Sequence, residues 1–222
     1  MPCKKLITAS NRIPLTASVS AIGLFIAILS TSVASSQSKW VFEQYNYIRQ
    51  PNASAFVPMV HFETKNNWYA ELRYNYEEAQ TLSLYGGKTF SGGSSFSWSF
   101  TPMAGYSTGR FTGVSAGMNN DAAWKDLYFS AQSQYSMATR TDMANFFFNW
   151  SEAGYSFSDH FYSGIAMQYT RQQQKDYFEP GIVSGFCFRN FSLPFYVFNP
   201  LKDDCYFVLG LNYEYNLKKK SK

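Results

Sequence analysis

The feature that most constrains this chain is a two-residue alternation of apolar and polar side chains, which recurs from Gln37 almost to the end. In the clearest segment, 68–77, one face carries Ala70, Leu72, Tyr74 and Tyr76 and the other carries Glu71, Arg73, Asn75 and Glu77. Because successive side chains of a strand point to opposite faces, this pattern predicts strands with one apolar and one polar face. No run of about 18 apolar residues follows Gln37, so the pattern predicts no membrane helix there.

The alternating segments number up to twelve: 39–50, 55–64, 68–77, 81–90, 96–106, 110–118, 124–137, 145–157, 161–171, 177–189, 191–198 and 205–217. Their lengths suit tilted membrane strands, which need about 9–11 residues. Turn-forming residues separate them, for example at 65–67 and 119–121. Four prolines fall inside these segments: Pro58, Pro102, Pro180 and Pro194. Proline cannot donate to a strand ladder, so either some of them lie at strand ends or bulges or the segment boundaries differ by several residues, and ten strands is the alternative count.

Residues 1–36 have the layout of a secretory signal peptide. Basic Lys4, Lys5 and Arg12 precede an apolar core at 19–29, and small residues follow it. We expect cleavage before Gln37; the alternative, an uncleaved anchor helix, has an apolar core too short to span about 30 Å of hydrocarbon. Residues 37–217 then form one domain, and 218–222 form a Lys-rich tail.

Composition indicates whether the polar face of the strands lines the barrel interior, as in a membrane barrel, or faces the surrounding solvent, as in a soluble barrel. Aromatic residues make up 19% of the chain and charged residues 15%, whereas soluble domains carry about 25% charged residues. A soluble lipocalin-type barrel also alternates, with its apolar face inward. The aromatic supply, with Trp40, Trp68, Trp98 and Trp124 near strand ends, and the weakly charged polar face favour a membrane barrel with aromatic girdles. No basic stripe exists, so no nucleic-acid partner is predicted.

The last predicted strand carries a recognisable motif. Gly210, Tyr213 and Tyr215 have the spacing glycine, two residues, aromatic, one residue, aromatic. This resembles the carboxy-terminal assembly signal of bacterial outer-membrane β-barrel proteins. The motif departs from the family in having Phe207 where a polar residue is preferred, and Leu217 and the tail follow the last aromatic residue.

The resemblance implies an all-β fold, a closed antiparallel up-and-down transmembrane barrel, in a Gram-negative outer membrane. The partners that it implies are outer-membrane lipid and the machinery that assembles outer-membrane barrels. We expect the lipid-facing set to include Ala70, Leu72, Tyr74, Leu127, Phe129, Ile165, Met167, Leu209, Leu211 and Tyr213.

The polar face of such a barrel predicts the lining of its interior: His61, Glu63, Glu71, Arg73, Asn75, Gln132, Gln134, Asn149, Gln168, Asn212 and Glu214. Charges among them would either brace the wall or tune a pore. The function predicted first is a small porin-like pore, a passive channel for small polar solutes. The alternatives are a structural or surface-interaction barrel with a packed interior and, third, a lipid-modifying hydrolase of the outer membrane.

Enzymatic and cofactor chemistry finds little support in the sequence. The two histidines, His61 and His160, lie far apart and lack partners at metal-ligand spacing, so no metal or other cofactor is predicted. His160 and Ser163 are close in sequence, but an odd offset places them on opposite faces of a strand, which disfavours a catalytic pair. No catalytic residue is therefore predicted.

Two cysteines, Cys187 and Cys205, follow the predicted signal peptide. With twelve strands they lie at opposite membrane interfaces, roughly 25 Å apart. A disulfide needs Cα atoms within about 7 Å. We therefore expect that these two cysteines do not pair.

Overall fold

The computed structural model describes residues 38–49 and 53–217. The predicted signal peptide and the Lys-rich tail lie outside the described residues, as does the segment 50–52. The described chain is all-β. Within these residues no helix is long and apolar enough to cross a membrane.

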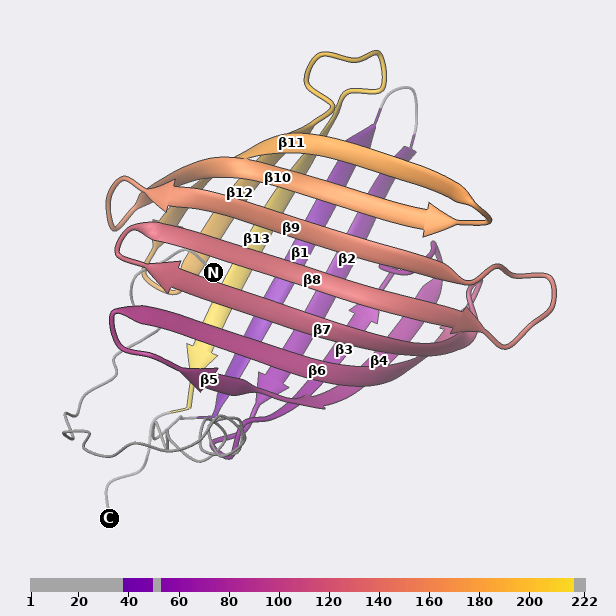
Figure 1. Cartoon of the computed structure of the whole chain (residues 1–222), viewed down its shortest axis with the longest axis horizontal. Helices are drawn as coiled ribbons and strands as arrows, with labels where there is room; N and C mark the ends of the chain where they lie inside the picture. The colour runs from indigo at the N-terminus through magenta and orange to yellow at the C-terminus, as the bar shows by residue number, and fades with distance from the viewer. Residues whose placement is uncertain (1–37, 50–52, 218–222) are drawn as a thin grey trace, which may run out of the picture.

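Thirteen strands follow one another as an antiparallel meander (Figure 1). They are β1 (Lys39–Arg49), β2 (Ala53–Glu63), β3 (Trp68–Tyr74), β4 (Thr81–Lys88), β5 (Phe90–Gly92), β6 (Phe96–Gly109), β7 (Gly113–Trp124), β8 (Leu127–Ala138), β9 (Phe146–Ser156), β10 (Phe161–Gln172), β11 (Lys175–Phe188), β12 (Phe191–Phe198) and β13 (Tyr206–Asn216).

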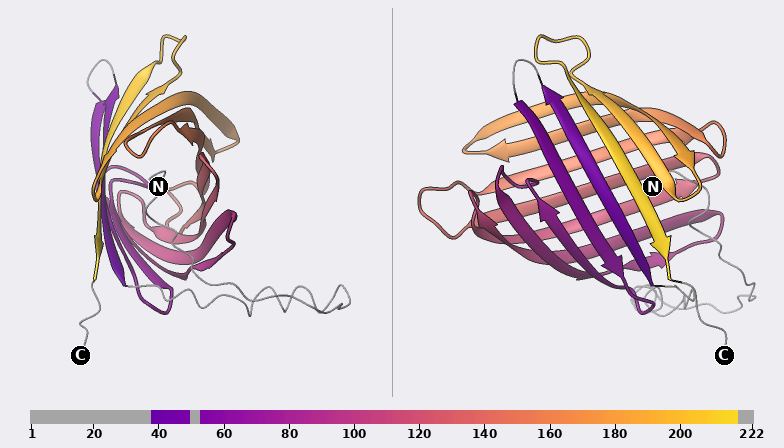
Figure 2. Two further views of the ribbon diagram at one scale, coloured as in Figure 1. Left: turned by 90° about the vertical axis from the view of Figure 1, so that its left-hand side faces the viewer. Right: turned by 180° about the vertical axis from the view of Figure 1, so that it is seen from behind.

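The sheet closes on itself. β1 pairs with β13, and β4 pairs with β6, so the sheet has no free edge and forms a ring (Figure 2). The short β5 continues β4 after a break at Thr89, and both pair with β6. Because β4 and β5 together occupy one strand position, the barrel has twelve strand positions around its circumference, which confirms the predicted closed twelve-stranded barrel.

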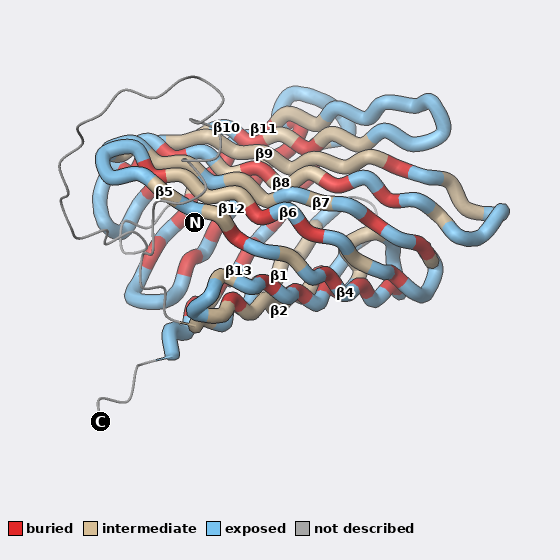
Figure 3. The backbone as a smooth tube through the Cα atoms, turned by 60° about the horizontal axis from the view of Figure 1, so that its bottom comes forward, coloured by how far each residue is buried: buried red, intermediate tan, exposed pale blue. Residues whose placement is uncertain are grey.

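Burial alternates along the strands, as Figure 3 shows. In β3, Arg73 is fully buried whereas Leu72 is 41% exposed. The outer face is thus mainly apolar, and the inner face carries most of the charged and amide side chains together with buried apolar residues such as Val183, Phe198 and Val208, the reverse of a soluble barrel. Every member of the expected lipid-facing set is exposed or half-buried.

The two ends of the barrel differ. The amide of Leu217 donates to the carbonyl of Ser38 at 2.9 Å, so both ends of the described chain meet at one end of the barrel, here called the proximal end. Turns there are short, such as 125–126 and 189–190, whereas the opposite, distal end carries the long connections 75–80, 139–145 and 199–205. Outer-membrane barrels have short periplasmic turns and longer outer loops, which matches the proximal and distal ends respectively.

Aromatic residues ring the proximal end. Trp40, Trp68 and Trp124 are 38%, 59% and 49% exposed, and Trp98 is half-buried. Lys88 and Lys125 place their ammonium groups over the rings of Trp68 and Trp124. An exposed aromatic ring with adjacent cations is the arrangement expected at a lipid–water interface.

The four strand prolines all lie where pairing with one neighbour is interrupted. Pro102 lies opposite the break at Thr89, and Pro194 lies in a gap of the β12–β13 ladder between the paired residues Ser192 and Phe195. Pro58 adjoins the end of β2–β3 pairing, and Pro180 adjoins the start of β11–β12 pairing. Each proline thus lies where the pairing with one neighbouring strand is already interrupted, so a twelve-stranded barrel can contain all four prolines.

The prediction of a turn at 119–121 is wrong. β7 continues through these residues to Trp124, and the turn is at Lys125, whose φ is 56°. Inside the barrel, the carboxylate of Asp121 accepts hydrogen bonds from Ser99 at 3.2 Å and Ser130 at 2.9 Å, on the two flanking strands. These bonds satisfy the hydrogen-bonding capacity of the Asp121 carboxylate within the strand, although the local turn propensity of 119–121 predicts a loop.

The cysteine expectation agrees with the structure. Cys205 is a free cysteine in the distal connection before β13. Cys187 lies near the proximal end of β11, next to the 189–190 turn. No bond therefore joins Cys187 to Cys205.

Candidate functional site in the barrel interior

Strand register decides which predicted residues point inward. Nine of the predicted lining residues lie on the inward face of their strands: His61, Glu63, Glu71, Arg73, Gln132, Gln134, Gln168, Asn212 and Glu214. All but His61 and Gln132, which are half-buried, are buried.

Asn149 is a correction, because the structure places it on the outer face of β9. Its cross-strand partner is Ser133, to which its amide donates at 2.8 Å, and Ser151 Oγ donates back to it at 2.5 Å. The next residue, Trp150, fills the inward position. In the middle of β9 the polar residues Asn149 and Ser151 lie on the outer face and the aromatic residues Phe148 and Trp150 on the inner face, so polarity alone assigns Asn149 to the wrong face.

Asn75 is the second correction. It lies beyond the end of β3 with φ of 59°, a left-handed conformation that asparagine tolerates. Its side chain donates to Phe56 O at 2.9 Å and accepts from the amide of Gln80 at 2.7 Å. Asn75 therefore closes the β3–β4 connection and does not line the interior.

That change of backbone direction reverses the residue that follows. The alternation predicts that Tyr76 shares the outward face of Leu72 and Tyr74. Instead, its ring packs edge-on against Phe148 of β9, with ring centroids 5.6 Å apart, and its hydroxyl donates to Gln132 of β8. No local signal in the sequence reports this inward turn, because its partners lie more than 50 residues away.

Arg73 is the centre of a buried polar cluster. Its guanidinium bonds Glu71, donates to Gln134 Oε1 at 2.7 Å and lies 3.5 Å from Glu77 Oε1. The ring of Tyr85 lies 4.2 Å from it. A buried charge is stable only when it is paired and hydrogen-bonded, and this cluster meets both conditions.

An aromatic cluster occupies the other side of the interior. Trp150 of β9 contacts Tyr45 of β1 at 5.6 Å and Tyr196 of β12 at 5.1 Å between ring centroids. Phe198 and Tyr206 extend it. β9 does not pair with β1 or β12, so these rings meet across the interior and narrow it.

Carboxylates outnumber basic groups among the described inward side chains. The carboxylates are Glu43, Glu63, Glu71, Glu77, Asp121, Glu152, Glu179 and Glu214, and the basic groups are Lys39, Arg49, Arg73 and, at the distal end of β11, Lys175. Three of these basic groups form ion pairs: Lys39 with Glu63 at 3.2 Å, Arg49 with Glu179 at 3.4 Å, and Arg73 within its cluster. The interior therefore has an excess of negative charge, and Asp121 is its most accessible carboxylate because it is exposed.

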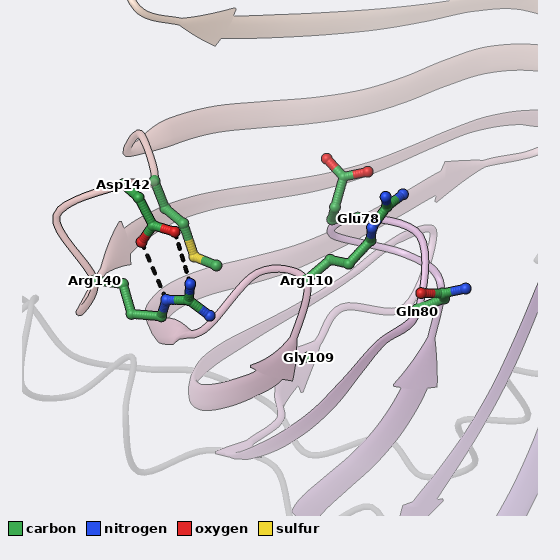
Figure 4. Close-up of a pocket in the computed structure, with 7 residues that line it drawn as sticks. Glu78, Gln80, Gly109, Arg110, Arg140 and Asp142 are labelled. Atoms are coloured by element: carbon green, nitrogen blue, oxygen red, sulfur yellow. Dashed lines mark hydrogen bonds and ion pairs between the residues drawn. The ribbon is translucent and has the colours of Figure 1, made fainter.

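A shallow pocket of about 690 Å³ lies at the distal mouth (Figure 4). It is lined by Glu78, Gln80, Gly109, Arg110, Arg140, Asp142 and Met143 from three distal connections. Arg140 donates to Asp142 at 2.6 Å, and this hydrogen bond holds the pKa of the exposed Asp142 carboxyl below its ordinary value. The mouth is therefore polar and carries both signs of charge.

Catalytic geometry is not formed at the His–Ser pair that is close in sequence. His160 Nδ1 lies 2.9 Å from the carbonyl of Cys187, whereas Ser163 Oγ donates to the carbonyl of Val183 at 2.8 Å. Their side chains thus engage different partners. Within 38–49 and 53–217, no group of three or more His, Cys, Asp or Glu side chains could hold a metal ion.

Comparison with known proteins finds likeness in structure alone. No family model and no curated protein sequence matches the chain. The KdgM porin matches 79% of this chain and 99% of its own, with a TM-score of 0.59 at 11% identity. The KdgM porin in complex with disordered oligogalacturonate matches with a TM-score of 0.60, and the NanC porin with 0.52, both at 11% identity, 79% coverage of this chain and 99% and 100% of their own. The chain therefore has the fold of these small porins.

Proposed function

We propose that this chain is a passive outer-membrane pore for small polar solutes that are neutral or cationic. The observation that carries the proposal is the barrel's inside-out construction: an apolar outer wall around an interior lined with carboxylates, amides and hydroxyls. A packed structural core would not need this many ionisable groups, because burying charge is costly. The likeness in fold to the KdgM and NanC porins supports it.

The charge of the interior argues for the kind of solute. The KdgM porin has been solved in complex with oligogalacturonate, a sugar polymer with a carboxylate on each unit. In the present chain, exposed Asp121 and the unpaired excess of interior carboxylates oppose the entry of such a polyanion by like-charge repulsion. Rings of acidic side chains are the usual device of cation-preferring pores.

The proposed location is the bacterial outer membrane, with the proximal end in the periplasm. The signal peptide 1–36 supplies export, and lipid covers the outer wall. Gly210, Tyr213 and Tyr215 are proposed as the signal that the assembly machinery reads. The chain is proposed to use no cofactor and to catalyse no reaction.

Reconstitution into planar lipid bilayers tests the pore. We expect discrete conductance steps and a reversal potential that indicates cation preference under a potassium chloride gradient. Absence of steps from barrels that are folded, as judged by their heat-modifiable migration on gels, would contradict it.

One observation favours a second candidate, a structural barrel with a packed interior. The rings of Tyr45, Trp150 and Tyr196 meet across the lumen, and beside them Arg73 of β3 bonds Gln134 of β8, also across the interior. A silent but folded barrel in the bilayer experiment would select this candidate.

A further inference from the structure

The connection between β3 and β4, residues 75–80, turns Tyr76 and Glu77 back into the barrel, whereas residues 78–80 remain exposed at the distal mouth. The amide of Asn75 donates to the carbonyl of Thr81 at 2.9 Å, and the Asn75 side chain bonds Gln80 and Phe56. These bonds close the base of the connection. The closed base directs Tyr76 and Glu77 into the interior; we call these two residues the latch.

Glu77 is anchored on its own side of the barrel. Its carboxylate accepts from Tyr85 Oη at 2.8 Å and from Ser83 Oγ, and it pairs with Arg73 at 3.5 Å. Its side chain has no exposed surface. A carboxylate in a distal connection would ordinarily point to water, so this burial requires the partners that receive it.

Tyr76 carries the latch to the opposite wall. It bonds Gln132 on β8 and packs on Phe148 of β9, strands that pair with neither β3 nor β4. Gln134 of β8 reaches back to Glu77 at 3.5 Å and to Arg73 at 2.7 Å. The latch therefore connects β3 and β4 to β8 and β9, strands with which they form no backbone pairing. It occupies part of the barrel interior beside the aromatic cluster.

We propose that the Tyr76–Glu77 latch is the constriction that sets the size limit of the pore. This rests on the proposed pore function and adds which residues determine solute size. The barrel wall is fixed by its ladder of hydrogen bonds, whereas the latch is held only by side-chain contacts at its tip. Loss of those contacts frees the connection to leave the lumen without any change in the wall.

Conductance and liposome swelling in sugars of increasing size test the size limit. We expect the Y76A/E77A variant to conduct several-fold more per channel than the unaltered barrel and to admit larger sugars. Tyr74→Ala is the matched control, because Tyr74 is the last residue of β3, two positions before the latch, with its side chain on the outer face, 39% exposed. Equal increases in both variants, or none in Y76A/E77A, would overturn the proposal.

A second measurement does not depend on conduction. Ser136 is fully buried beside the latch, where it bonds Gln134 and Ser115. In a Cys205→Ser background, Ser136→Cys is labelled with a hydrophilic maleimide in the folded, detergent-solubilised barrel. Adding Y76A/E77A should speed labelling about tenfold, and an unchanged rate would overturn the latch even if the barrel conducts.

The same measurement separates the two proposals. If Y76A/E77A speeds labelling but no variant conducts, the latch closes the interior as proposed, and the proposed pore function is wrong. If Y76A/E77A does not fold, Gln132→Ala removes the acceptor on β8 and leaves the connection intact, and it should also speed labelling of Ser136→Cys. No increase from Gln132→Ala would then contradict the latch.

Discussion

Arg73 Nη1 lies 3.5 Å from Glu77 Oε1, and neither side chain has any exposed surface. The two residues are only four positions apart, but one belongs to β3 and the other to the connection that re-enters the barrel. Glu71 also pairs with the guanidinium, so the cluster holds two carboxylates around one cation. The cluster is therefore both a brace for the wall and the anchor of the latch.

Replacement of Arg73 by Met should destabilise the barrel strongly. It leaves Glu71 and Glu77 buried without their cation, and breaking a buried ion pair costs about 3–5 kcal/mol. Urea unfolding in detergent, followed by tryptophan fluorescence, measures the loss. The E71Q/R73M/E77Q variant removes all three charges and should recover most of the stability. If it does not, the unpaired carboxylates of Glu71 and Glu77 are not the cause of the destabilisation in Arg73→Met.

Leu211 and Asn212 are neighbours on opposite faces of β13, 42% and 6% exposed. An arginine on the lipid face near the midplane costs about 2–4 kcal/mol. Leu211→Arg should therefore lower the yield of folded, heat-modifiable barrel more than Asn212→Arg, which places its charge in a carboxylate-rich interior. Equal yields, or the reverse order, would contradict the inside-out assignment.

Gly210 has a packing role in addition to the role in assembly proposed for it. A Cβ atom on this residue would lie 2.5 Å from Pro194 Cγ and 2.9 Å from Tyr45 Cε1. Gly210→Ala should therefore destabilise the barrel by about 1–3 kcal/mol, the cost of overpacking. Pro194→Ala removes the nearest contact, so the double variant should be more stable than the sum of single effects predicts in urea unfolding. Strict additivity would indicate that Gly210 acts only in assembly.

Asp121 should contribute to cation preference because it is the exposed carboxylate of the interior. Asp121→Asn should lower the cation-to-anion permeability ratio about twofold, measured as a reversal potential across a salt gradient. Asp203→Asn is the control, since Asp203 lies exposed in the connection before β13. An unchanged ratio in Asp121→Asn would place the selectivity elsewhere.

The wall of this protein could be predicted from the amino-acid sequence alone. Alternation in segments such as 68–77 and 205–217 predicts the strands and their number, because it depends on the side chains of one strand and on the face that each presents. The aromatic supply, the weakly charged polar face and the motif in the last strand predict that the apolar face points outward. That strand pairing is interrupted near prolines such as Pro102 and Pro194 could also be predicted, because proline lacks the backbone N–H that pairing needs.

The filling of the interior could not be predicted in this way, because it depends on contacts between distant strands. Asn149 points outward because the register of β8 and β9 opposes it to Ser133 and turns Trp150 inward, and polarity cannot choose a face where both faces carry polar groups. Tyr76 leaves the alternation because Asn75 adopts a positive φ, and Gln132 and Phe148 receive it from the far wall. These contacts join residues distant in sequence, and their energies exist only after the barrel has closed.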